Sequence, residues 1–125
     1  MSAGIAQLEE CLKPGFYEAL AVKTKKMVDD VQAHTDAKGY PFHMFHVGSI
    51  FWMSFSNKNR VQRASDIDPK SSERFKIFFD ALLENGVYAG PSGYEVGFVS
   101  QAHSEEDLAK AASAMKAALD AAYAN

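Results

Sequence analysis

The sequence contains a single cysteine, no long apolar run and no excess of basic charge. One cysteine, Cys11, cannot form an internal disulfide, so we expect a reducing compartment and a cytoplasmic protein. The neighbouring Leu8 and Leu12 indicate that its thiol is buried or half-buried. No apolar run reaches the roughly 18 residues of a membrane span, and the N-terminus lacks a secretory pattern. We therefore expect no membrane partner.

The charge pattern argues against a nucleic-acid partner. The formal net charge is −3, and the only basic cluster, at Lys23–Lys26, is followed at once by Asp29 and Asp30. Mixed charges of this kind are typical of a solvated helix face, whereas a phosphate-binding surface needs clustered positive charge.

The length and composition predict one domain, residues 1–125. A chain of 125 residues with 47% hydrophobic residues can bury one core. Apolar residues recur at helical spacing in four segments that stopping or capping residues bound. The first two segments are Ile5–Leu12, which Pro14 stops, and Phe16–Lys38, which Gly39 and Pro41 stop. The third is a helix that Asp68-Pro69 starts and Asn85-Gly86 ends, with its core side formed by Phe75, Phe78, Phe79, Leu82 and Leu83. The fourth begins at Ser104 and carries on one face Leu108, Ala112, Met115 and Leu119.

The remaining apolar segments have the aromatic and β-branched content of strands. Residues 42–56 predict two strands, with Phe51, Met53 and Phe55 on one face and Ile50 and Trp52 on the other. A loop over 57–72 follows, and short strands are expected at 87–88 and 94–99. This order implies an α+β fold with a small, largely antiparallel sheet and helices packed on one face. Both sheet faces are partly apolar, which suggests that the second face meets something outside these residues.

The sequence offers few groups for chemistry. His43 and His46 are three residues apart in an extended segment, so they should lie on opposite faces, and no metal site is predicted. Motifs for a serine nucleophile, a phosphate-binding glycine loop and a paired-cysteine redox site are absent. Ser92 is interpreted as a turn residue.

Glu95 is the one polar residue in a segment of glycines, aromatics and valines. Strand alternation favours a position on the solvent side of an edge strand, with Tyr94 and Val96 facing inward. The alternative is that the carboxylate takes part in chemistry, and alternation alone leaves both open.

A resemblance adds weight to the second alternative. GVYAGPSGYEVGFVSQAHSEEDLAKA, at Gly86–Ala111, resembles the C-terminal signature of glutamate-1-semialdehyde 2,1-aminomutase, a pyridoxal-phosphate (PLP) enzyme of the class III aminotransferase group. VGSIF at Val47–Phe51, ERFKIFFDALLENGVY at Glu73–Tyr88 and AGIAQLEECLKPGFYEAL at Ala3–Leu20 are similar to the same family in the same order. The resemblance covers almost the whole chain, and PSGYEVGF together with AHSEEDL is its most specific part.

The resemblance implies that the chain is the C-terminal small domain of a longer, fold type I PLP enzyme. The large domain, the Schiff-base lysine and the phosphate-binding groups would lie outside it, so no cofactor-binding residue is assigned here, and the chain alone is expected to bind no PLP and to be inactive. The parent enzyme would be a homodimer that converts glutamate 1-semialdehyde, a small-molecule substrate, to 5-aminolevulinate for tetrapyrrole (porphyrin) biosynthesis. Glu95 is the one residue that the resemblance places in the active site, as a carboxylate that supports the chemistry near an amine.

Two departures from the family pattern lie close to this signature. Ala89-Gly90 stands where the family usually has a larger residue followed by alanine, and Trp52–Ser54 replaces a stretch that is commonly glycine, leucine and phenylalanine. We expect neither to touch Glu95, although both would shape the wall near it. They leave two other interpretations open: a different class III aminotransferase, or a free-standing interaction or dimerisation module.

Overall fold

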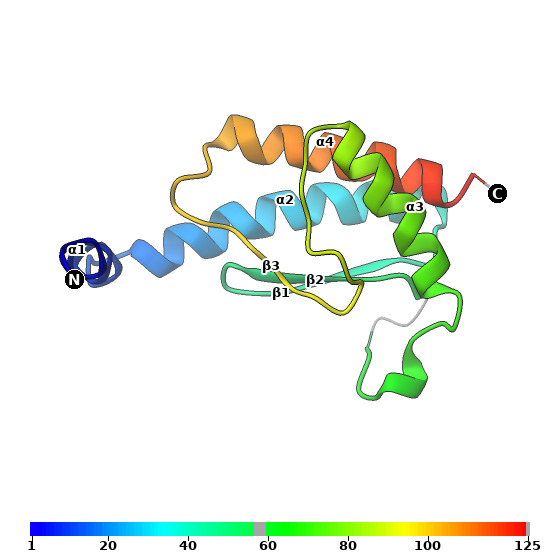
Figure 1. Ribbon diagram of the computed structural model, residues 1–125, viewed down its shortest axis with the longest axis horizontal. Coiled ribbons are helices and arrows are strands. Elements are labelled where there is room, and N and C mark those ends of the chain that lie inside the picture. The colour runs from blue at the N-terminus through cyan, green and yellow to red at the C-terminus, as the bar shows by residue number, and fades with distance from the viewer. Residues whose placement is uncertain (57–59, 125) are drawn as a thin grey trace.

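The computed structural model describes residues 1–56 and 60–124 and has the α+β fold that the sequence predicts (Figure 1). Part of the predicted loop, residues 57–59, lies outside the described residues. The three-stranded sheet has the order β1-β2-β3 and is antiparallel throughout. The elements are α1 (Ser2–Cys11), α2 (Phe16–Lys38), β1 (His43–Val47), β2 (Ile50–Ser54), the 3-10 turn η1 (Ala64–Asp66), α3 (Ser71–Glu84), β3 (Gly97–Phe98) and α4 (Glu105–Ala122).

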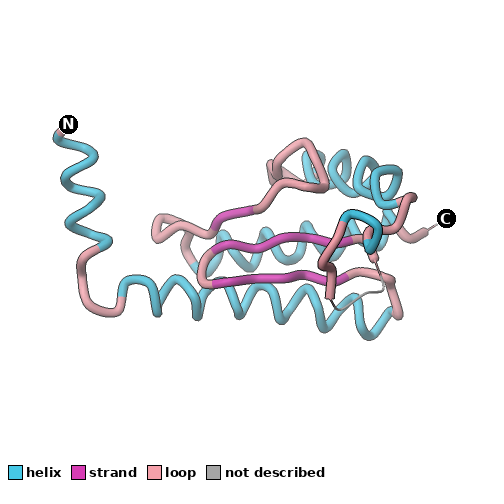
Figure 2. The backbone as a smooth tube through the Cα atoms, turned by 90° about the horizontal axis from the view of Figure 1, so that it is seen from below, coloured by secondary structure: helices cyan, strands magenta, loops and turns pink. Residues whose placement is uncertain are grey.

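The helices α2, α3 and α4 gather on one face of the sheet, as predicted. Figure 2 shows the opposite face in front, with helices behind it. The core lies between the two layers, because each helix buries its apolar stripe there. Within the described residues, no helix is both long and apolar enough to cross a membrane.

Helix α1 forms where the sequence predicts it, but its apolar stripe stays largely exposed in the described chain. Ile5, Leu8 and Leu12 are 55%, 64% and 82% exposed, and α1 lies at the far end of α2, away from the sheet (Figure 1). Cys11 is half-buried, within the range expected. Gly15 adopts a φ of 80°, a left-handed conformation that glycine tolerates, and this allows the chain to turn into α2.

Helix α2 is the long amphipathic helix that the sequence predicts. Leu20, Met27 and Val31 are buried, and two threonines are buried with them. The threonine hydroxyls are satisfied within the helix: Thr24 donates to the Leu20 carbonyl at 2.8 Å, and Thr35 donates to that of Gln32 at 2.9 Å. The lysines of the predicted solvated face pair with nearby carboxylates or carbonyls, which agrees with that interpretation.

Strands β1 and β2 form a hairpin with the predicted facing. Phe51 and Met53 are buried under the helices, while Ile50 and Trp52 point to the opposite face. Trp52 stacks on Phe45 of β1, with ring centroids 5.7 Å apart. The aromatic pair therefore covers part of the outer face of the sheet.

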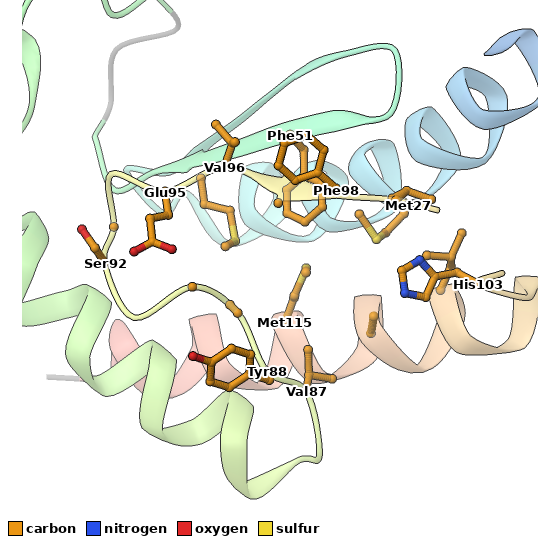
Figure 3. A pocket seen from close by; sticks show the side chains of 18 of the residues that line it. Met27, Phe51, Val87, Tyr88, Ser92, Glu95, Val96, Phe98, His103 and Met115 are labelled. Carbon is orange, nitrogen blue, oxygen red and sulfur yellow. The ribbon is translucent and has the colours of Figure 1, made fainter. Parts of the chain in front are cut away.

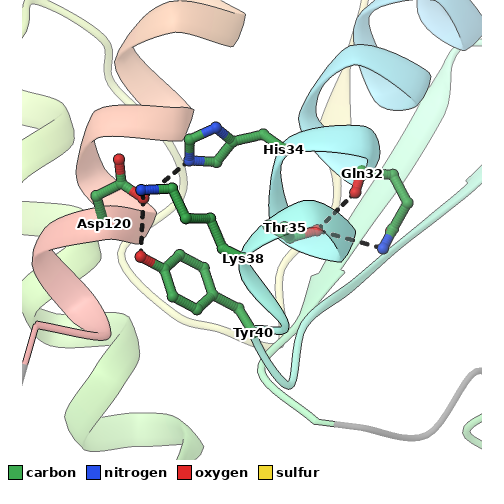
Figure 4. Close-up of polar contacts among 6 residues, drawn as sticks. All are labelled: Gln32, His34, Thr35, Lys38, Tyr40 and Asp120. Atoms are coloured by element: carbon green, nitrogen blue, oxygen red, sulfur yellow. Dashed lines mark hydrogen bonds and ion pairs between the residues drawn. The ribbon is translucent and has the colours of Figure 1, made fainter.

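Gln32 of α2 covers the outer edge of β1. Its Oε1 accepts a hydrogen bond from the Met44 N–H at 2.9 Å, and its Nε2 donates to the Phe42 carbonyl at 3.4 Å. The same Nε2 also donates to Asp36 and, as Figure 4 shows, to Thr35. The side-chain amide thus joins the helix to the strand edge.

Helix α3 is the core-facing helix that the sequence predicts, with two corrections. Phe75, Phe78 and Leu82 are buried, but Leu83 is 44% exposed. Eight residues after Phe75, at 100° per residue, Leu83 has rotated about 80° from Phe75, away from Phe78 and Leu82, and leaves the core.

The start of α3 is the second correction, because Asp68 does not cap the helix. The helix begins at Ser71, and Asp68 instead accepts from the Lys70 N–H at 2.9 Å and from the Arg74 guanidinium at 3.0 Å. The hydrogen bond from the Lys70 N–H, aided by Arg74, lowers the pKa of Asp68 against the opposing effect of burial. The carboxylate is used in a local turn, which delays the first helical residue.

Helix α4 begins as predicted, with Ser104 as its cap. The Ser104 hydroxyl accepts from the Asp107 N–H at 3.0 Å, and the Asp107 carboxylate accepts from the Ser104 N–H at 2.8 Å, which forms a capping box. Hydrogen bonds from the hydroxyl and N–H of Ser104 lower the pKa of Asp107. Ala112, Met115 and Leu119 are buried along one face, as expected.

A polar cluster joins the C-terminal ends of α2 and α4 (Figure 4). His34 Nε2 lies 2.8 Å from Asp120 Oδ1, and the Tyr40 hydroxyl donates to the same oxygen at 2.9 Å. Burial alone would raise the pKa of Asp120, but the hydrogen bonds from His34 and Tyr40 lower it overall. The hydrogen bond to Asp120 in turn raises the pKa of Tyr40. The cluster therefore fastens the two long helices together beside the core.

Candidate functional site

The segment that carries Glu95 leaves α3, passes over the end of the core and returns along the sheet. Two strands were predicted here, but residues 87–88 form none, and only Gly97–Phe98 pairs with β2. The Val87 N–H donates to the Leu82 carbonyl at 2.9 Å, so it completes the end of α3 and is not available to a sheet. Most of the segment is therefore a loop.

Three contacts hold this loop against the domain. Trp52 Nε1 donates to the Gly93 carbonyl at 2.9 Å. A Cβ atom on Gly93 would lie 3.3 Å from the Phe75 ring, and one on Gly97 would lie 2.6 Å from Phe51 Cε1. Gly93 and Gly97 thus allow the backbone to approach two core rings closely. The hydrogen bond from Trp52 of the sheet fixes the turn at Gly93.

The loop closes one side of a cavity of about 220 Å³, whose other walls come from the sheet, α2 and α4 (Figure 3). The lining is mainly apolar, and a few polar side chains stand at its border, as in many small-molecule sites. Apolar lining residues include Met27, Phe51, Met53, Phe75, Phe98 and Met115, and the polar ones are Ser92, Glu95, His103 and Asp107.

Glu95 extends its carboxylate into this space between the returning strand and the loop (Figure 3). The residue is exposed, and within the described residues its carboxylate has no hydrogen bond or ion pair. Its backbone N–H donates to the Ser92 carbonyl at 3.0 Å. The carboxylate is therefore held near the cavity by the backbone while its charge stays available. Its role in an active site stays a prediction.

The expected facing of the neighbouring side chains is wrong. Tyr94 and Val96 are 65% and 48% exposed, and neither packs inward. Strand alternation does not apply, because residues 94–96 are not in a strand. Ser92 is a turn residue, as predicted: its carbonyl accepts from the Glu95 N–H, and its hydroxyl accepts from the Tyr94 N–H at 3.3 Å.

The expectation that Ala89-Gly90 does not touch Glu95 is also wrong. A Cβ atom built on Gly90 would lie 2.9 Å from Glu95 Cδ and closer still to its Oε2. The carboxylate of Glu95 rests directly against the Gly90 backbone. The sequence could not show this contact, because it depends on the tight return of the loop.

His103 lies at the border of the same cavity, and the sequence did not single it out (Figure 3). Its Nδ1 accepts a hydrogen bond from the Ser100 N–H at 3.0 Å, so the proton of the neutral ring belongs on Nε2. Lys23 of α2 donates to the His103 carbonyl at 2.6 Å and secures the turn before α4. The place of His103 within AHSEEDL, just before the Ser104 cap, is the signal in the sequence that points to it.

The other histidines do not form a site. His43 pairs with Ser54 and His46 with Phe51, which places them on opposite faces, as predicted. In residues 1–56 and 60–124, no cluster of three or more histidine, cysteine, aspartate or glutamate side chains could hold a metal ion.

The cavity does not by itself suit PLP. Among the residues that the structure describes, its lining contains no lysine to combine with the aldehyde of PLP, and neither lysine nor arginine to bind the phosphate. What this chain offers is an imidazole, carboxylate and hydroxyl groups, and an apolar wall. Any PLP beside this cavity would need binding groups from elsewhere.

Comparisons with known proteins identify solved structures of similar fold. No protein-family model matches the chain. Among solved structures, a transaminase with PLP bound is 24% identical with a TM-score of 0.76, and the match covers 98% of this chain and 27% of that one. An omega-transaminase from Sphaerobacter thermophilus is 18% identical with a TM-score of 0.74, covering 89% and 25%. A beta-phenylalanine aminotransferase from Variovorax paradoxus is 18% identical with a TM-score of 0.69, covering 79% and 22%.

These matches concern the fold alone, since all three identities are low. The chain spans about a quarter of the length of each transaminase. The fold is nevertheless shared over 98%, 89% and 79% of this chain in the three matches. The predicted fold class is confirmed: this chain has the small-domain fold of the aminotransferases.

Proposed function

We propose that residues 1–125 form the C-terminal small domain of a longer PLP-dependent enzyme of the transaminase type. The observation that carries this proposal is the fold similarity over 98% of the chain to a transaminase with PLP bound. The cavity supports it, because Glu95 contributes a carboxylate that has no hydrogen-bond or ion-pair partner among the described residues. PLP would supply the electron-withdrawing chemistry, and this chain would supply part of the wall around the substrate.

Within this enzyme we propose that Glu95 interacts with the amino group of a small-molecule substrate. A carboxylate near an amine favours the ammonium form and holds it by a charge-assisted hydrogen bond. The apolar side chains around Glu95 would strengthen that attraction by excluding water. The longer enzyme would assemble as a homodimer, and residues 1–125 alone would be inactive.

The reaction that we propose first is the conversion of glutamate 1-semialdehyde to 5-aminolevulinate. It rests on the resemblance of PSGYEVGF and AHSEEDL, at residues 91–98 and 102–108, to the aminomutase signature. The second candidate is amino transfer between an amine and a keto acid. The favouring observation is that the solved structures of similar fold include an omega-transaminase, a beta-phenylalanine aminotransferase and a further transaminase.

The first experiment is to read the gene upstream of Met1. A continuous reading frame that encodes a large domain with a candidate PLP lysine would support the enzyme. The longer protein would then be assayed with glutamate 1-semialdehyde alone and with paired amines and keto acids, which separates the two reactions. An in-frame stop just before Met1 would contradict the enzyme and leave the interaction module, for which the exposed Val47 and Phe98 offer an apolar surface.

The role of Glu95 is tested by Glu95→Gln in the longer protein. We expect turnover to fall about tenfold or more, equivalent to roughly 1.4 kcal/mol of transition-state stabilisation, with an unchanged melting temperature. Glu84→Gln is the matched control, because Glu84 is exposed at the end of α3 and does not line the cavity. Equal kinetics of both variants and the parent would remove Glu95 from the site.

A further inference from the structure

A small polar recess lies where the end of β2 meets the first turn of α3 and the turn that precedes Glu95. Its volume is about 20 Å³, and the serines in its lining are Ser54, Ser71 and Ser72. A space of this size holds about one water-sized group. The recess is therefore too small for a whole ligand, but one oxygen atom of a ligand fits into it.

Ser54 brings to this recess a buried hydroxyl group that lacks a partner. The residue is 2% exposed, and its Oγ forms no hydrogen bond within the described residues. Alternation along β2 directs its side chain to the same face as that of Trp52, which also lines the recess. Buried hydroxyl groups are nearly always hydrogen-bonded, because leaving one unpaired destabilises the fold. Serine stands here where the family that the sequence resembles commonly has phenylalanine, so the hydroxyl is a feature of this chain.

The first turn of α3 adds backbone donors to the same place. The helix begins at Ser71 without a side-chain cap, and in the part of the chain that the structure describes the backbone N–H groups of Ser72 and Glu73 have no acceptor. Unpaired N–H groups at the start of a helix form the positive end of its dipole, so they favour a negative charge. Because Ser71 and Ser72 line the recess, its wall combines this helix end with the buried hydroxyl of Ser54.

A wider hollow of about 260 Å³ adjoins the recess along α3. Ser72 and Tyr94 line both spaces, so the two lie side by side. The hollow adds the apolar side chains of Phe79 and Pro91, and Lys76 brings a positive charge to its border. Small-molecule sites commonly combine an apolar wall with a few polar groups that fix the orientation of the ligand. Together the two spaces suit a ligand with one anionic group and an apolar body.

We propose that the recess binds the carboxylate of a small carboxylic acid whose apolar body lies in the adjoining hollow. An ionised carboxylate only accepts hydrogen bonds, and the recess offers donors: the Ser54 hydroxyl and the N–H groups of the first turn of α3. One carboxylate oxygen matches the volume of the recess, whereas an ammonium group would meet the positive end of the helix dipole. The site uses neither Glu95 nor PLP, so it goes beyond the proposed function.

The site is tested by nuclear magnetic resonance on the 125-residue chain, titrated with sodium phenylacetate. We expect saturable shifts of the Ser72 and Glu73 amide signals. Sodium chloride at the same ionic strength and 2-phenylethanol, which has the apolar body without the charge, should give no such shifts. Ser54→Ala should weaken phenylacetate binding about tenfold or more, because it removes a hydrogen bond to a charged group.

Ser113→Ala is the matched control, since Ser113 is exposed on α4 and lines neither space. It should bind phenylacetate like the parent. Melts without ligand separate binding from folding: Ser54→Ala should melt at the parent temperature or above it, because the hydroxyl that it removes is buried and unpaired. A clearly lower melting temperature of Ser54→Ala would show that the hydroxyl has a partner within the fold, and the proposal would fail.

Four other results would also overturn the proposal. The absence of saturable shifts would leave the recess a site for water alone, and equal shifts with chloride would reduce it to an ordinary helix end. Tighter binding of inorganic phosphate than of phenylacetate would contradict the carboxylate assignment. Binding that Ser54→Ala leaves unchanged would remove the buried hydroxyl from the site. None of these measurements uses the longer enzyme, so their failure leaves the proposed function untouched.

Discussion

Replacing Phe78 with alanine tests whether the aromatic core between α3 and the sheet holds the domain together. Phe78 is fully buried on α3. Its ring lies 5.4 Å from that of Phe55 at an interplanar angle of 69°, and 6.2 Å from that of Phe75. Alanine at this position would remove apolar burial, two ring contacts and the volume of a benzyl group.

The free energy of unfolding should fall by about 3–5 kcal/mol, which is the usual range when alanine replaces a fully buried phenylalanine. A domain of this size has a total stability of about 5–15 kcal/mol, so the variant would retain a reduced but measurable transition. The melting temperature should fall by roughly 9–25 °C, because each kcal/mol shifts a domain of this length by about 3–5 °C.

Urea unfolding followed by circular dichroism measures this loss directly. Ile77→Ala is the matched control, since Ile77 precedes Phe78 on the same helix but is 39% exposed, and it should cost less than about 1 kcal/mol. If Phe78→Ala melts like the parent, or if the two variants lose the same stability, Phe78 is not part of the core as described.

Three further predictions follow from the caps, the glycines and a buried tyrosine. Ser104→Ala should cost about 1 kcal/mol in urea unfolding through loss of the α4 cap, whereas Ser113→Ala on the exposed face of α4 should not. Gly97→Ala should cost about 1–3 kcal/mol, because its methyl group would press on the Phe51 ring, and a melt unchanged from the parent would contradict the close approach. Burial raises the pKa of Tyr123 from 10.0 to about 12. The contribution that this raised pKa makes to the free energy of unfolding is therefore complete below pH 10 and is lost as the pH rises through 12. Tyr123→Phe should reduce this loss of stability at alkaline pH, measured as melting temperatures over a series of pH values.

The helices could be predicted because each carries its own pattern. Leu20, Met27 and Val31 mark the buried face of α2 without reference to anything else, and the capping box of α4 is local. Helix α1 shows the limit of such patterns. Its stripe of Ile5, Leu8 and Leu12 predicts a helix correctly, but periodicity does not say what the apolar face contacts.

The site was harder to predict, because it depends on contacts between distant residues. Alternation failed at Tyr94 and Val96 since too few residues pair with β2 to make a strand there. The importance of Glu95 came from resemblance, whereas the cavity beside it needs α2 and α4 as walls. The contact between Gly90 and Glu95 follows from a turn whose shape no sequence pattern specifies.

The side-chain amide of Gln32 has a consequence for how chains of this protein meet one another. An open strand edge is a template on which a second chain can add a strand, and repeated addition leads to aggregation. The carbonyl of Phe42, just before β1, and the N–H of Met44 on β1 face that edge, and Gln32 engages both. At the other edge, β3 offers only two residues. A fourth strand would have to displace a helix-anchored amide on one side and would find almost no template on the other, so the sheet is protected against growth by propagation.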